Sequence, residues 1–152
     1  MPVGYTAMFA AKLDELSALS VREAREGDRL APGAALVARA GRHLLLERAQ
    51  SGFVEAQLRT EPLDKPHRPS VDVLFRSAAD TYGSRVLAVV MTGMGEDGRE
   101  GAAWVKAQGG TVLTEAEESC VIYGMPRSVV ESGLSDAAFP LDSMAEGITK
   151  YL

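Results

Sequence analysis

Two adjacent carboxylates, Glu96 and Asp97, lie in a glycine-rich turn directly after a short apolar run. The run extends from Val86 to Met91, and the turn reads TGMGEDG over residues 92–98. A helix-like segment and a second apolar run at 111–114 follow, which predicts a strand–turn–helix–strand unit. Open parallel sheets carry their ligands and chemistry at the carboxyl ends of strands. A carboxylate at this place can serve a functional site, and its partners decide the chemistry.

The turn formally matches the G-x-G-x-x-G pattern of dinucleotide-binding domains at Gly93, Gly95 and Gly98. Glu115 follows at about the spacing of a ribose-binding acid. Against this interpretation, the two carboxylates in the turn would repel a pyrophosphate in a poorly hydrated site. A second interpretation is a tight turn with solvated acids, which the dipole of the following helix favours. A third is a catalytic carboxylate that orients a histidine, and all three stay open on the pattern alone.

Composition and charge exclude several classes of protein. The 152 residues are 46% apolar and 24% charged, which is typical of one soluble globular domain. A net charge of −5 argues against nucleic acid as a partner. No apolar run approaches membrane-spanning length, and the N-terminus lacks the basic region of a signal peptide. With one cysteine and two distant histidines, we expect no disulfide, no metal site and a cytoplasmic location.

Hydrophobic periodicity and turn signals predict alternating helices and strands. We expect an amphipathic helix at 4–19, with Thr6 as a candidate N-cap, and a helix that begins after Ser70. The run 86–91 is the most apolar, so it is predicted to be a central strand buried on both faces. Short strands are expected at 21–24, 35–38, 43–47, 54–58 and 111–114, of which the second to fourth suggest an antiparallel hairpin or meander. Further helices are expected at 99–108, 126–131 and 141–152.

Four blocks of the chain resemble, in the same order, the chemotaxis protein-glutamate methylesterase family (CheB). They are PVGYTAMFAAKL at 2–13, HRPSVDVLF at 67–75, TGMGEDG at 92–98 and EAEESCVIYGMPRSV at 115–129. The resemblance covers essentially all 152 residues. It implies an α/β fold: a three-layer, Rossmann-like, mostly parallel sheet with an inserted antiparallel hairpin or meander. It also implies a cytoplasmic hydrolase of chemotaxis that removes glutamate methyl esters from chemoreceptor helices and deamidates glutamines, with a Ser-His-Asp triad and no cofactor.

The resemblance assigns the triad aspartate to Asp97 and makes the backbone N–H of Met94, with Gly95 beside it, a candidate oxyanion donor. His67 and Met125 are expected to line the cleft. The family's triad serine and histidine match no position in this sequence and would precede residue 1. The chain is therefore expected to be the C-terminal three quarters of a methylesterase domain, inactive by itself. The phosphorelay receiver domain of this response-regulator family is expected as a partner in the full-length protein.

An alternative interpretation is a non-catalytic module that docks on receptor helices or on a regulator. Three other residues are expected to have structural roles. His43 is expected on a strand surface, Trp104 in the core, and Cys120 as a packed small side chain rather than a nucleophile.

Overall fold

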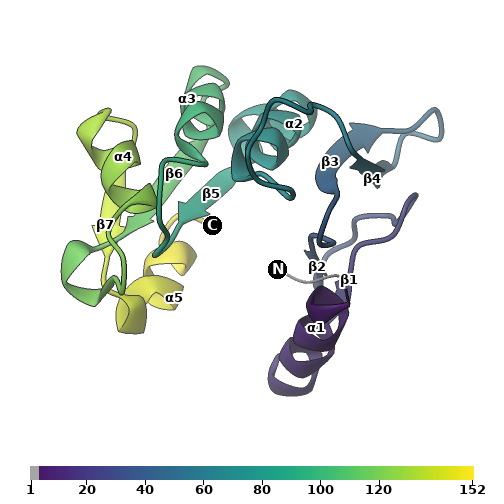
Figure 1. Cartoon of the computed structure of the whole chain (residues 1–152), viewed down its shortest axis with the longest axis horizontal. Helices are drawn as coiled ribbons and strands as arrows, with labels where there is room; N and C mark the ends of the chain where they lie inside the picture. Colours follow the sequence, from purple (N-terminus) through teal and green to yellow (C-terminus); the bar gives the residue numbers. More distant parts are fainter. Residues whose placement is uncertain (1–3) are drawn as a thin grey trace. The chain divides into compact units, whose positions relative to one another are not determined.

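The computed structural model describes residues 4–152, which divide into two compact units. The first unit ends at Ser77 and the second begins at Ala78. Each unit contains parallel strands covered by helices, and the first also contains an antiparallel pair (Figure 1). The α/β class predicted from the sequence is confirmed.

The first unit combines a parallel pair of strands with a separate hairpin. Its elements are α1 (Tyr5–Leu16), β1 (Ser20–Glu23), β2 (Ala34–Val37), β3 (His43–Arg48), β4 (Val54–Arg59) and the beginning of α2 (Val71–Tyr82). β3 and β4 pair antiparallel, with Leu44 opposite Leu58. The core of the unit is the buried cluster Ala24, Leu44 and Ala56. This core joins the end of β1 to the hairpin, with Leu44 packed with two alanines.

Two expectations for this unit are wrong in detail. The strand expected at 35–38 does not continue the hairpin into a meander, because β2 pairs parallel with β1. Thr6 does not cap α1, because Gly4 takes the N-cap position. Thr6 is instead fully buried: its hydroxyl donates to Glu23 (2.5 Å) and accepts from the backbone N–H of Ala40 (3.2 Å). Its polar group stabilises the packing of α1 on the sheet, which a local capping signal cannot reveal.

The second unit is a three-stranded parallel sheet in the order β5-β6-β7. Its strands are β5 (Leu87–Val90), β6 (Thr111–Glu115) and β7 (Ala137–Phe139). Its helices are α3 (Arg99–Ala107), α4 (Met125–Glu131) and α5 (Leu141–Thr149), with the short 3-10 helices η1 (Gly83–Arg85) and η2 (Glu117–Ser119). α3 and α4 contact each other, and α5 lies on the other side of the strands (Figure 1). The sheet is thus the middle layer of three.

The most buried strand of this sheet is β6, not the predicted β5. Val112 and Leu113 point to opposite faces of β6, and both are fully buried. β5 pairs only with β6 among the described strands, and its residues Leu87 and Val89 are half-buried. High hydrophobicity therefore marked a strand of the sheet but not its place in the strand order.

Candidate functional site

The glycine-rich turn follows β5 at the carboxyl end of the parallel sheet. It leads into α3, whose N-cap is Gly98 with φ 101°. Gly95 has φ 91°. Both values lie in the left-handed region that only glycine occupies without strain, so the two glycines fix the path of the turn. The predicted strand–turn–helix unit is therefore present, with the turn where the sheet's chemistry is expected.

The two acids of the turn have different surroundings. Glu96 is exposed and forms an ion pair at 3.1 Å with Arg99, the first residue of α3. Asp97 is half-buried and directly precedes the N-cap glycine of α3. Glu96 thus has the surroundings of a surface residue, whereas the burial of Asp97 suits a carboxylate that holds a partner group.

A second segment, residues 122–125, is joined to the turn by hydrogen bonds that are mostly between backbone groups. The carbonyl of Gly93 accepts from the N–H groups of Met125 (2.8 Å) and Gly124 (3.1 Å). The N–H of Gly93 donates to the carbonyl of Ile122 (3.0 Å), and the N–H of Ile122 donates to the Thr92 hydroxyl (2.9 Å). The two segments therefore behave as one structural piece. We call residues 92–95 and 122–125 the clamp.

Glu115 lies beneath the clamp at the end of β6 and is 1% exposed. One carboxylate oxygen accepts from the backbone N–H of Thr92 (2.9 Å), and the other accepts from the Ser119 hydroxyl (3.0 Å). A carboxylate engaged in this way cannot reach out to a ribose. The dinucleotide interpretation required Glu115 to bind a ribose, so this arrangement argues against it. Sequence reasoning gave Glu115 no structural role, because its partners are distant along the chain.

Four of the predicted site residues come together in this unit. Asp97, Met94 and Gly95 share the turn, and Met125 opens α4 in the other half of the clamp. Met94 is 78% exposed and so is no core residue. Met125 is half-buried, with its side chain against Gly93.

His67, the fifth predicted site residue, belongs to the first unit and is exposed. Its loop is fastened by His43, which is fully buried rather than on the strand surface as expected. The Nδ1 atom of His43 accepts from the N–H of Ser70 (3.3 Å). Its Nε2 atom therefore carries the proton and donates to the carbonyl of Pro62 (3.2 Å). This neutral imidazole holds both ends of the segment that contains His67.

Cys120 and Trp104 also belong to the second unit. Burial raises the pKa of the Cys120 thiol, and the nearby charge of Glu115 raises that pKa further, so the group is not an activated nucleophile. Trp104 is 37% exposed and its indole N–H donates to Asp80 (2.6 Å), so the expected core position is wrong. The amphipathic ring covers the helix surface and satisfies its polar atom there.

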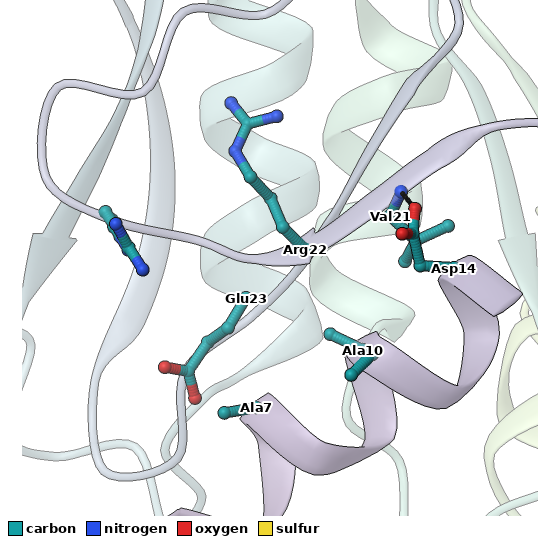
Figure 2. Close-up of a pocket in the computed structure, with 8 residues that line it drawn as sticks. Ala7, Ala10, Asp14, Val21, Arg22 and Glu23 are labelled. Atoms are coloured by element: carbon teal, nitrogen blue, oxygen red, sulfur yellow. Dashed lines mark hydrogen bonds between the residues drawn. The ribbon is translucent and has the colours of Figure 1, made fainter.

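A pocket of about 290 Å³ in the first unit lies between α1 and β1, far in sequence from the predicted site residues (Figure 2). Three alanines of α1 form one side of the pocket, and their small side chains leave it open. The lining residues are Ala7, Ala10, Ala11, Asp14, Val21, Arg22, Glu23 and Arg25. Asp14 accepts from the N–H of Val21 (2.6 Å), and Glu23 accepts from Thr6. Both acids are already engaged in holding α1 against β1, so we interpret the pocket as a gap in the packing of these two elements.

Within residues 4–152, no group of three or more His, Cys, Asp or Glu side chains is placed to hold a metal ion. None of the helices in that range is long and apolar enough to cross a membrane.

The fold and the turn together define a Rossmann-like α/β domain with a half-buried aspartate at the carboxyl end of its parallel sheet. The family model described as CheB methylesterase matches residues 1–148. The chain therefore belongs to the CheB methylesterase family.

Relatives and a solved structure agree with this membership. The chain is 51% identical, over all of its length, to "Protein-glutamate methylesterase/protein-glutamine glutaminase 5" of Myxococcus xanthus. It is 50% identical, over 97% of its length, to "Protein-glutamate methylesterase/protein-glutamine glutaminase" of Moorella thermoacetica. It covers 43% and 35% of these two proteins, so it spans less than half of their length. The crystal structure of the Thermotoga maritima CheB methylesterase catalytic domain matches with a TM-score of 0.95 and 41% identity, over 100% of this chain and 80% of that one.

Proposed function

We propose that this chain supplies the aspartate-bearing part of a protein-glutamate methylesterase and glutamine deamidase, with Asp97 as the acid of a Ser-His-Asp triad. The observation that supports this most is the half-buried Asp97 in a TGMGEDG turn at the carboxyl end of the parallel sheet. The relatives at 51% and 50% identity carry the name of this activity. The triad serine and histidine are proposed to lie outside these 152 residues.

In such a triad the serine attacks the carbonyl carbon of the glutamyl methyl ester while the histidine takes the serine proton. The histidine then gives that proton to the departing methoxide, and methanol leaves. Water attacks the acyl-enzyme in the same manner and releases the glutamate carboxylate. Asp97 accepts from the Nδ1–H of the histidine, fixes its tautomer and stabilises the cation that forms. With glutamine as substrate, ammonia leaves in place of methanol.

The other site residues are assigned supporting roles. The backbone N–H of Met94 is the proposed donor to the oxyanion, in a turn whose path Gly95 fixes by its left-handed φ of 91°. Met125 and His67 are proposed to line the substrate cleft. The proposed substrates are methylated helices of chemoreceptors, and the proposed regulator is a receiver domain in the full-length protein.

The test is a chimera in which residues 1–152 replace the matching segment of the Myxococcus xanthus relative. We expect it to release methanol from methylated chemoreceptor at a rate near that of the relative. Asp97→Asn is expected to lower the rate by roughly 10²–10⁴, because the histidine loses its orienting carboxylate. Glu96→Gln is the matched control. It should change the rate by less than about threefold, since Glu96 pairs with a surface arginine.

Three results would contradict the proposal. A folded chimera that releases no methanol would exclude the methylesterase function and favour a non-catalytic docking module. Equal effects of the two substitutions would show that Asp97 is not the triad acid. Methanol release by the 152-residue chain alone would place a nucleophile and a base within it.

A further inference from the structure

We propose that Glu115 is a positioning residue whose buried carboxylate fixes the start of the turn at residues 92–98 and thereby the place of Asp97. The catalytic meaning of this inference rests on the proposed function, whereas the placement of the turn can be tested without it. Glu115 touches none of the groups assigned to the reaction. It acts through the backbone of Thr92.

Burial makes the carboxylate of Glu115 costly unless its oxygens are matched by donors. The side chain is 1% exposed, and both of its oxygens have a donor, the Thr92 N–H at 2.9 Å and the Ser119 hydroxyl at 3.0 Å. A buried acid held in this way fixes the groups around it, because moving either donor leaves a charged oxygen unmatched.

The position of Glu115 follows from the strand register. β5 and β6 run parallel with Val90 beside Thr114, so the next residue of β6 lies beside the beginning of the turn. Its carboxylate spans from the Thr92 N–H to Ser119 in η2. The Ser119 hydroxyl also accepts from the backbone N–H of Leu141, the first residue of α5 (3.0 Å). One carboxylate thus links the turn, η2 and α5.

Asp97 lies between two anchors of the same turn. The first anchor is Thr92, held by Glu115 and by the clamp. The second is the beginning of α3, where the carbonyl of Gly98 accepts from the N–H of Ala102 (2.8 Å). Between the two anchors the chain passes through Gly95, and glycine has more backbone conformational freedom than any other residue type. Loss of the first anchor should therefore shift Asp97 while the sheet and α3 stay folded.

The structural test compares three variants of the 152-residue chain by amide hydrogen exchange. Glu115→Met removes both acceptor oxygens at similar volume, and Glu115→Gln keeps a carbonyl oxygen for the Thr92 N–H. Thr114→Val is the matched control: its hydroxyl is equally buried but pairs with Ser135 (2.8 Å) rather than with the turn.

We expect Glu115→Met to speed exchange of the Thr92 and Gly93 amides by at least about tenfold, the loss of roughly one hydrogen bond. The Thr111 amide, which donates to Val86 at the other end of the same strand pair, should keep its rate relative to global unfolding. Glu115→Gln and Thr114→Val should leave the exchange of Thr92 at the wild-type value. Equal acceleration of Thr92 and Thr111 in Glu115→Met would reduce Glu115 to a general stability role and overturn the inference.

The activity test uses the chimera, with rates normalised to the folded fraction measured by circular dichroism. Glu115→Met should lower kcat by roughly 10- to 100-fold, as expected for a misplaced catalytic group, and leave KM within about twofold. Glu115→Gln should restore kcat, and Thr114→Val should not change it. A wild-type kcat in a folded Glu115→Met chimera would overturn the inference. An inactive parent chimera would instead contradict the proposed function, and the exchange data would still decide the placement of the turn.

Discussion

Substitution of Gly124 by alanine tests the clamp directly. Gly124 has φ −102°, so its backbone conformation does not itself require glycine. A methyl group on it would nevertheless lie 2.7 Å from the carbonyl oxygen of Gly93 and 3.0 Å from the backbone nitrogen of Gly95. Both neighbours are backbone atoms, which cannot rotate away as a side chain can. Gly124→Ala must therefore push the two halves of the clamp apart.

The magnitude follows from what such a shift breaks. Carbon atoms normally approach other heavy atoms to about 3.5 Å, so the Gly93 carbonyl must move by roughly half an ångström or more. It accepts hydrogen bonds from the N–H groups of Gly124 and Met125, at 3.1 and 2.8 Å, and both are weakened. Overpacking of this kind costs about 1–3 kcal/mol, and each weakened hydrogen bond adds up to about 1 kcal/mol. We expect a total loss of about 2–4 kcal/mol.

Urea unfolding followed by circular dichroism measures this loss. With an m value of about 2 kcal/mol/M, the midpoint should fall by about 1–2 M. Gly93→Ala is the control, because the atoms nearest to its methyl group would belong to the side chain of Met125, with Sδ at 2.4 Å, and not to the backbone. A methionine can adopt another rotamer, so the midpoint should fall less, and adding Met125→Ala should relieve the contact. A Gly124→Ala midpoint within about 0.2 M of the wild type would refute the rigid clamp.

Two further stability predictions concern the second unit. Burial raises the pKa of Asp136, but hydrogen bonds from Lys106 and from a backbone N–H of β6 outweigh it and hold that pKa below its ordinary 3.8. Because the pKa of Asp136 is lower in the folded state than in the unfolded state, this stabilisation is complete above pH 3.8 and is lost as the pH falls through the folded value. Asp136→Asn should lower the free energy of unfolding by about 1–3 kcal/mol at pH 7, measured by urea unfolding. The difference in stability between the variant and the wild type should shrink below about pH 4. Gly147→Ala in α5 gains about 1 kcal/mol of helix propensity, but its methyl group would lie 2.6–2.9 Å from three ring atoms of Phe139, a clash of about 1–3 kcal/mol. Thermal unfolding should show a Tm lower by a few degrees, and a higher Tm would mean that propensity outweighs packing.

Local patterns predicted most of the elements from the sequence. Turn glycines and apolar periodicity placed α3, β6 and α4 within one or two residues of their observed bounds. The same patterns failed where pairing is non-local. The strand at Ala34–Val37 is a short apolar run that precedes two other short strands, as in a meander, yet it pairs parallel with β1. Nothing within such a segment states its partner, because the partner is chosen by packing across the whole unit.

The site divides in the same way. The exposed part, Met94 to Asp97, carries its signal in the spacing of its glycines, since those positions demand left-handed backbone. The buried part, Glu115, is separated from its donor Thr92 by 23 residues. In the sequence it looked like a ribose-binding acid, because its position after a strand was visible and its hydrogen-bond donors were not.

This division explains why a glycine turn alone is a weak functional signal. Both a dinucleotide loop and an aspartate-bearing turn need glycines to bring the backbone into tight curvature, so the glycines do not distinguish the two. What distinguishes them is the fate of the acid after the next strand. A ribose-binding acid must extend outward into the ligand site, whereas Glu115 is turned inward and engaged by Thr92 and Ser119. If Glu115 fixes the turn from beneath, as proposed, Asp97 is held at the end of the sheet, which is the arrangement that the proposed histidine-orienting carboxylate requires.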